Sequence, residues 1–198
     1  MKPEVRIQNA IRALEDKETQ WEALIEALNE LKSIAFSNPA TFNSNMATVT
    51  TLVVKNCNNI RSRISGAAIE TLKELFRLLK KKMMPHLNES VAALIAEAGK
   101  ENVFIREKCE RCLAEIVDTG LGTNQKLFAS LAPHGKSKNQ TARILAAQFV
   151  HMAVGKIGAD KCLAGNATTK SVIRLALFFC AAKIFRKNLS KIFHLRRF

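Results

Sequence analysis

The stretch that decides the fold is ISGAAIETLKEL, residues 64–75, because its spacing returns elsewhere in the chain. In this stretch an apolar residue is followed four positions later by a small residue. A second apolar residue comes four positions after the small one, and a third comes three positions after that. The same order occurs in IREKCERCLAEI (105–116) and ARILAAQFVHMA (142–153), and in part in ALNELKSI (27–34). The small residues are at 27, 68, 109 and 146, so the copies lie 41, 41 and 37 residues apart. Self-similarity at about 40 residues is typical of the paired helices of HEAT and armadillo repeats.

The composition favours an all-α protein built as an α–α solenoid of these repeats. The chain has no Tyr, eight Gly and four Pro among 198 residues, which leaves room for long helices and little for hairpins. Apolar periodicity predicts helices over residues 3–16, 21–37, 44–55, 60–82, 91–98, 104–117, 127–131 and 141–154. Asn88, Glu89 and Ser90 are expected to cap the helix that begins at Val91.

The domain organisation follows from where the repeat and the acidic residues stop. Residues 1–165 are predicted to form one repeat domain, and residues 166–198 a basic, apolar helical segment that caps the stack. No Asp or Glu follows Asp160, whereas Lys161 to Arg197 contribute nine Lys or Arg to the net charge of +14. The alternatives for this segment are an amphipathic helix on an anionic membrane and a poorly packed end.

Charge and cysteine content limit the possible partners and location. The net positive charge fits an acidic partner, which could be nucleic acid, an anionic membrane or a protein. No apolar run reaches the about 18 residues that a membrane span needs. Five cysteines at helical positions, without disulfide-scaffold spacing, indicate a reducing compartment. With no signal peptide recognisable at the start of the sequence, we expect the cytoplasm.

Short polar joints precede the recurrent helices and alternate with longer joints that contain Pro39 and Pro85. In a stack of helix pairs, joints of one set emerge along the same edge. The short joints are 16–21, 56–61, 99–104 and 134–140, and each carries a cation or is next to one. This edge is therefore predicted to be the binding surface.

The joints and the helices after them resemble TOG domains of the CLASP and crescerin groups. The first resemblance is QWEALIEALNEL (20–31), and the second is NIRSRIS (59–65) followed by ETLKELF (70–76). KENVFIRE (100–107) and HGKSKN (134–139) resemble the third and fourth segments. The similarity covers about residues 5–165, and the expected fifth loop and final helix pairs have no matching copy in residues 171–198.

The resemblance implies a flat HEAT-repeat paddle whose joints bind αβ-tubulin or microtubules, as part of the regulation of ciliary microtubule dynamics at the cytoskeleton. Trp21 would be the apolar contact. The other expected tubulin-binding residues are Lys17, Arg61, Ser62, Arg63, Lys100, Asn102, Arg106, Lys136 and Lys138. Tubulin is strongly acidic, so the sign of the charge agrees. We expect a monomer that binds neither nucleic acid nor membrane.

Less specific explanations remain for several of these residues. Trp21 could be an ordinary core side chain. Arg106 could hold neighbouring loops by hydrogen bonds to backbone carbonyls as readily as it could contact a partner. Cys109 and Cys112 have CxxC spacing but are not expected to form a metal or redox site. We expect Cys109 to be the small core residue of its repeat. No catalytic, cofactor or metal site is predicted, because His86, His134, His151 and His194 form no ligand or catalytic spacing.

Two other functions are compatible with the sequence. A HEAT or armadillo adaptor could bind an acidic protein or peptide through its concave helical face rather than through the joints. A nucleic-acid-binding solenoid would also fit the charge, but stacking aromatics are absent from the basic edge apart from Trp21. The tubulin-binding module is the favoured hypothesis.

Overall fold

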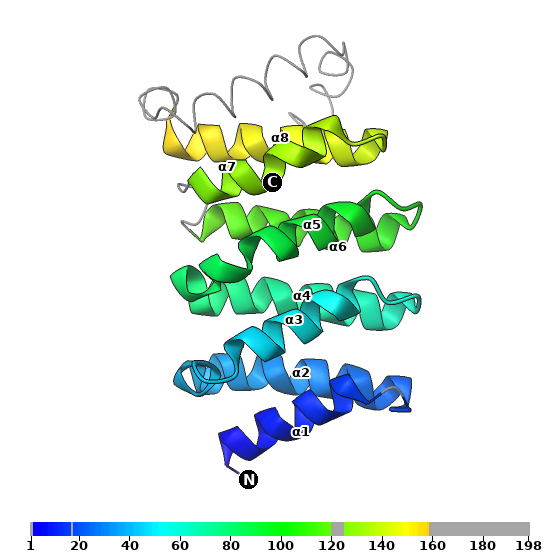
Figure 1. Cartoon of the computed structure of the whole chain (residues 1–198), viewed down its shortest axis with the longest axis vertical. Coiled ribbons are helices and arrows are strands. Elements are labelled where there is room, and N and C mark those ends of the chain that lie inside the picture. The colour runs from blue at the N-terminus through cyan, green and yellow to red at the C-terminus, as the bar shows by residue number, and fades with distance from the viewer. Residues whose placement is uncertain (1, 17, 120–124, 159–198) are drawn as a thin grey trace, which may run out of the picture.

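The computed structural model describes residues 2–16, 18–119 and 125–158, and these form a stack of helix pairs (Figure 1). The pairs are α1 (Pro3–Glu15) with α2 (Trp21–Ser37), α3 (Met46–Cys57) with α4 (Ser62–Leu79), α5 (Leu87–Ala98) with α6 (Val103–Asp118), and α7 (Gln125–Leu131) with α8 (Gln140–Ile157). Short 3₁₀ helices lie between successive helices: η1 (Pro39–Phe42) between α2 and α3, η2 (Lys80–His86) between α4 and α5, and η4 (Ala132–Lys136) between α7 and α8. The all-α solenoid expected from the repeat is confirmed.

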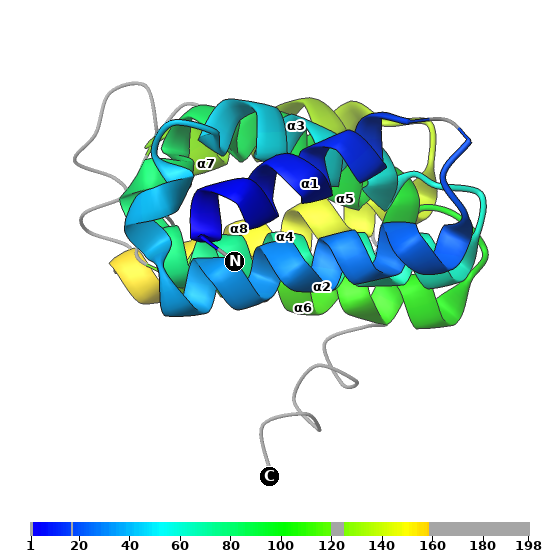
Figure 2. The ribbon, with the colours of Figure 1, turned by 90° about the horizontal axis from the view of Figure 1, so that it is seen from below.

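The helices form two layers (Figure 2). The first helices of the pairs, α1, α3, α5 and α7, make one layer, and α2, α4, α6 and α8 make the other. Each recurrent helix contacts its equivalent in the next pair, α2 with α4, α4 with α6 and α6 with α8. A buried hydroxyl also links two repeats, because Thr71 Oγ1 donates to the Leu28 carbonyl at 3.1 Å.

The small residues of the repeat are in the core between these helices. Ala68, Cys109 and Ala146 have no exposed surface, and Ala27 in the first pair is also buried. Large apolar side chains such as Phe76 and Leu72 belong to the same buried cluster. The periodicity therefore identified both the helices and their buried faces.

The joint between α4 and α5 differs from the prediction. The helix expected to reach residue 82 ends at Leu79, because Lys80 has a positive φ of 47° and cannot continue it. Residues 88–90 do not cap a helix beginning at Val91. Instead η2, with Pro85 inside it, runs directly into α5 at Leu87. Ser90 is buried within α5, and its Oγ has no hydrogen-bond partner among the described residues.

The predicted segment 166–198 lies outside the described residues, as do residues 159–165 of the predicted repeat domain. The division at residue 165 stays a prediction. Among the helices that are described, none has both the length and the apolarity needed to cross a membrane.

Candidate functional site

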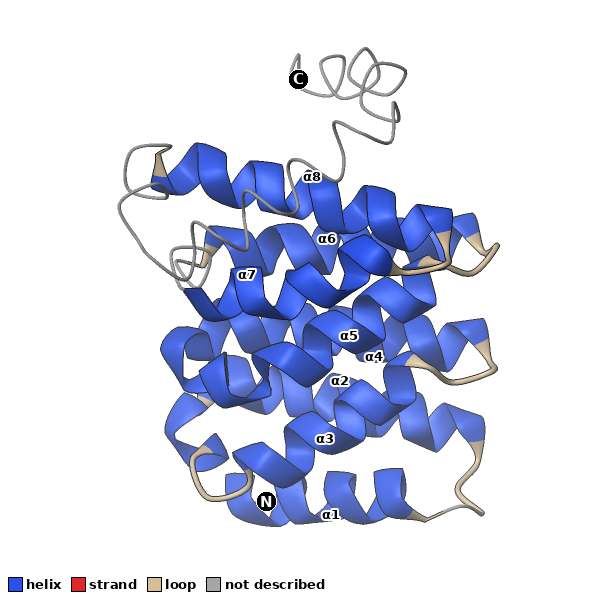
Figure 3. Cartoon of the chain, turned by 45° about the horizontal axis from the view of Figure 1, so that its top comes forward, coloured by secondary structure: helices blue, strands red, loops and turns tan. Residues whose placement is uncertain are grey.

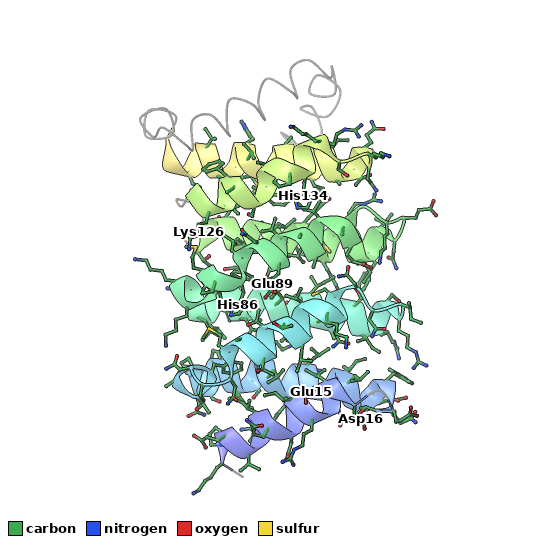
Figure 4. The ribbon with its side chains drawn as sticks, viewed as in Figure 1. Glu15, Asp16, His86, Glu89, Lys126 and His134 are labelled. Atoms are coloured by element: carbon green, nitrogen blue, oxygen red, sulfur yellow. The ribbon has the colours of Figure 1, made fainter. Side chains whose placement is uncertain are left out.

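The four short joints emerge at the same end of their helix pairs and line one edge of the stack, as the repeat predicted (Figures 1 and 3). We define the joint edge as joints 16–20, 58–61, 99–102 and 136–139 together with the first turn of the helix after each. Lys17 lies outside the described residues. Asp16, at the end of α1, lies on this edge, while His86 and Glu89 are toward the opposite one (Figure 4).

Trp21 is partly buried, between the two roles that the sequence left open for it. It is the first residue of α2, and its ring is partly buried against the hydrophobic core. The Arg63 guanidinium from α4 lies over the ring, 5.4 Å from its centroid, in a cation–π arrangement. The structure thus brings together two predicted contact residues from neighbouring repeats, with the indole surface shared between core and arginine.

Three exposed apolar side chains on the joint edge were missed by the sequence analysis. Ile60 is 100% exposed in the second joint, and Val103 and Phe104 are 59% and 57% exposed at the start of α6. Lys108 Nζ lies 5.1 Å from the Phe104 ring centroid. Ile60 and Val103 could have been noticed because each is apolar yet stands outside the buried stripe of the following helix.

The predicted cations of the joint edge differ in their surroundings. The side chains of Arg61, Lys136 and Lys138 are exposed and have no ion-pair partner within the described ranges. Lys100 is also exposed, but its ammonium forms an ion pair with the buried carboxylate of Glu97. Arg61, Lys136 and Lys138 therefore carry unneutralised charge, while the ion pair holds Lys100 in place.

Arg106 and Asn102 shape the third joint. Arg106 Nε donates to the Ala98 carbonyl at 3.0 Å, and Nη2 donates to the Lys100 carbonyl at 2.8 Å. The Asn102 side chain caps α6 by accepting from the Ile105 N–H at 3.2 Å. Of the two roles left open for Arg106, the structure displays the one that holds loop carbonyls. Contact with a partner stays a prediction for both residues.

The fourth joint repeats this arrangement. Arg143 Nη1 donates to the Ser137 carbonyl at 2.7 Å and to the Lys138 carbonyl at 3.0 Å. Asn139 caps α8 by accepting from the Ala142 N–H at 3.1 Å. Arg143 follows Asn139 by four residues, as Arg106 follows Asn102. Arg143 on α8 thus holds the main chain that carries Lys136 and Lys138.

The second joint is held by smaller side chains. Ser65 occupies the position that corresponds to Arg106, and its Oγ donates to the Cys57 carbonyl at 2.6 Å. Asn59 Oδ1 accepts from the Arg61 N–H at 3.0 Å. Ser62 is exposed as the first residue of α4. These bonds fix the chain on both sides of Ile60.

The cysteines and histidines make no chemical site in the described part of the chain. Cys57, Cys109 and Cys112 are buried free thiols. His86 Nδ1 lies 3.0 Å from a Glu89 carboxylate oxygen, and burial lowers the pKa of His134. No three His, Cys, Asp or Glu side chains within the described residues converge as metal ligands would.

Alkaline pH is expected to destabilise the protein through these thiols. Burial raises the pKa of Cys109 to about 12, and raises those of Cys57 and Cys112 as well. The unfolded thiol ionises near its ordinary pKa of 9.0, so between pH 9 and 12 the unfolded chain binds fewer protons and stability falls as pH rises. At pH 10 each buried thiol should lower the free energy of unfolding by about 1 kcal/mol.

Urea unfolding at pH 7 and at pH 10 measures this loss. Cys109→Ala keeps a small core side chain and should reduce the difference between the two pH values by about 1 kcal/mol. A variant that loses as much stability between pH 7 and pH 10 as the unmodified chain would show that Cys109 does not contribute.

Comparison with known proteins gives consistent similarities. A family model described as CLASP N terminal matches residues 4–189. The chain is 36% identical over 136 residues to the TOG array regulator of axonemal microtubules protein 1 of Mus musculus, which is 69% of this chain and 7% of that protein. It is 25% identical over 161 residues to a crescerin-like protein of Caenorhabditis elegans, covering 81% of this chain and 12% of that protein.

Among solved structures, the MAST/Orbit N-terminal domain superposes with a TM-score of 0.63 at 15% identity. The superposition covers 91% of this chain and 86% of that one, which confirms the fold. The chain spans only a small part of the length of the curated relatives that it matches.

Proposed function

The chain belongs to the family described as CLASP N terminal, and from this premise we propose that it is a TOG-type module that binds αβ-tubulin through the joint edge. The mouse and human relatives are named regulators of axonemal microtubules, which supports a role at microtubules. We propose the cytoplasm and cytoskeleton, including the cilium, as its location. The chain would act by binding, without catalysis.

The observation that carries the proposal is the position of Ile60. A fully exposed isoleucine, followed by Arg61, stands on the same edge as Phe104 and the exposed lysines of the fourth joint. Exposed apolar side chains among cations suit a partner that combines an apolar contact with an acidic surface. The cations would steer the acidic partner to the edge, and the apolar side chains would be buried on contact.

Substitution of Ile60 with aspartate tests the proposal. Because Ile60 is fully exposed, the change should leave thermal unfolding unaltered. We expect the affinity for purified αβ-tubulin to fall at least about tenfold, the equivalent of 1.4 kcal/mol, measured by gel filtration and titration calorimetry. Binding should also weaken as NaCl rises from about 50 to about 300 mM, because exposed charges are screened.

Phe36→Asp is the matched control. Phe36 is 72% exposed near the end of α2, away from the joint edge, so the same loss of an exposed apolar side chain and the same added charge occur elsewhere. The control should bind as the unmodified chain does. Failure of the unmodified chain to co-elute with tubulin at low salt would contradict the proposal, as would equal binding by Ile60→Asp. A loss confined to Phe36→Asp would instead favour the adaptor that uses its helical face.

A further inference from the structure

Asn139 connects two neighbouring joints as well as capping its own helix. While Oδ1 accepts from the Ala142 N–H, Nδ2 donates to the Gly99 carbonyl at 2.9 Å, across 40 residues of sequence. The amide side chain thus uses its acceptor within the fourth joint and its donor on the third. An aspartate could provide the cap but has no donor for this second bond. A serine could also provide the cap, but its single, shorter hydroxyl cannot take the places of both amide atoms.

Gly99 gives Asn139 the room that it needs. A Cβ at position 99 would lie 2.8 Å from Asn139 Nδ2, closer than real Cβ atoms approach other heavy atoms. The φ of Gly99 is −71°, so any residue could adopt its backbone conformation. Glycine therefore leaves space for the Asn139 amide, and its dihedral freedom is not needed here.

The bridge completes a network that spans both joints. The three successive carbonyls of Ala98, Gly99 and Lys100 accept from Arg106, Asn139 and Arg106 respectively. On the other side, Arg143 holds the Ser137 and Lys138 carbonyls, and Ser137 Oγ accepts from the Asn139 N–H at 3.2 Å. The main chain beside Lys100 is therefore tied to the main chain beside Lys138.

The other N-caps of the joint edge make no such connection among the described residues. Asn102 caps α6 in the same way, but its amide makes no hydrogen bond to a neighbouring joint. Gln20 and Arg61, at the corresponding positions before α2 and α4, have no side-chain cap bond. Among the described residues, a cap side chain bonds to a neighbouring joint only between the third and fourth joints.

We propose that Asn139 and Gly99 are positioning residues that fix the third and fourth joints to each other, so that Lys100, Lys136 and Lys138 meet an acidic partner as one preformed unit. This inference rests on the proposed tubulin-binding function. Holding both joints in advance lowers the conformational entropy that is lost on binding. Asn139 need not touch the partner to have this effect.

Asn139→Ser against Asn102→Ser is the decisive comparison. Serine is as good an N-cap as asparagine, so both variants should unfold at similar temperatures, but only Asn139→Ser removes the bridge. The Gly99 and Lys100 amides donate to the Ile95 and Glu97 carbonyls. In Asn139→Ser, a change 40 residues later in the sequence, we expect hydrogen exchange at the Gly99 and Lys100 amides to become at least about tenfold faster. We also expect the tubulin affinity to fall about five- to tenfold.

Asn102→Ser should leave exchange in the fourth joint, at the Ser137 amide, nearly unchanged. Asn139→Asp, which also keeps the cap, and Gly99→Ala, which displaces the amide from the other side, should reproduce the effect of Asn139→Ser. Unchanged exchange at Gly99 and Lys100 in Asn139→Ser would overturn the bridge. Faster exchange with unaltered tubulin affinity would overturn the positioning role but leave the proposed function standing.

If the unmodified chain does not bind tubulin, the proposed function fails, and with it the role of the bridge in that binding. The exchange measurement would still decide whether Asn139 holds the third joint. The two failures are therefore distinguishable.

Discussion

Replacement of Arg106 with lysine is expected to lower the free energy of unfolding by about 3 kcal/mol, although the charge is kept. The Arg106 guanidinium donates to the Ala98 and Lys100 carbonyls through two different nitrogens. A single ammonium cannot reproduce this fork, and each hydrogen bond from a charged group contributes about 1.5–3 kcal/mol. Urea unfolding measures the change directly.

Arg111→Lys is the control for this substitution. Arg111 is exposed on the same helix, and its side chain makes no hydrogen bond to another described residue. Its replacement should change stability by no more than about 0.5 kcal/mol. Equal stability of the two variants would show that the loop bonds of Arg106 contribute little. A stable Arg106→Lys variant with weakened tubulin binding would assign Arg106 to the partner contact instead.

Replacement of Ala68 with leucine is expected to destabilise the stack by a similar amount, about 3 kcal/mol. Ala68 is fully buried on α4, which packs against α2, α3 and α6. Additional methylene groups in a close-packed interior force side chains out of their rotamers or push helices apart. Because each repeat contacts only its neighbours, a displacement of α4 would disturb both adjacent pairs.

Ala67→Leu provides the comparison at the adjacent position. Ala67 is only partly buried, so its replacement should cost less than about 1 kcal/mol. Thermal or urea unfolding of both variants tests whether the small residue of the repeat is a packing requirement. Similar stability for the two variants would contradict that interpretation.

Much of the fold could be predicted from the sequence because its signals are local. Pro39 marks the end of α2, and the small residues at 68, 109 and 146 identify the buried stripes of α4, α6 and α8. The alternation of joints follows from the repeat, so the position of the joint edge was predicted with it. Lys80 is the exception, since no sequence pattern indicates that a lysine has a positive φ.

The details of the site depend on contacts that sequence separation hides. The cation over Trp21 comes from Arg63, 42 residues later, and the bond to Gly99 comes from Asn139. The exposure of Ile60 depends on the direction of its side chain relative to the helix that follows. Such contacts form only when neighbouring repeats stack. Composition and spacing could therefore predict the position of the joint edge but not the contacts within it.

The matched pairs Asn102–Arg106 and Asn139–Arg143 also have a consequence for protein engineering. The spacing Asn-x-x-x-Arg combines a helix cap with a clamp on the preceding loop, and both parts lie within five residues. It could be searched for in other helical-repeat sequences to identify joints that are rigid before any partner arrives. Grafted onto a designed repeat scaffold, it would offer a compact way to stiffen a variable loop without changing the loop residues themselves.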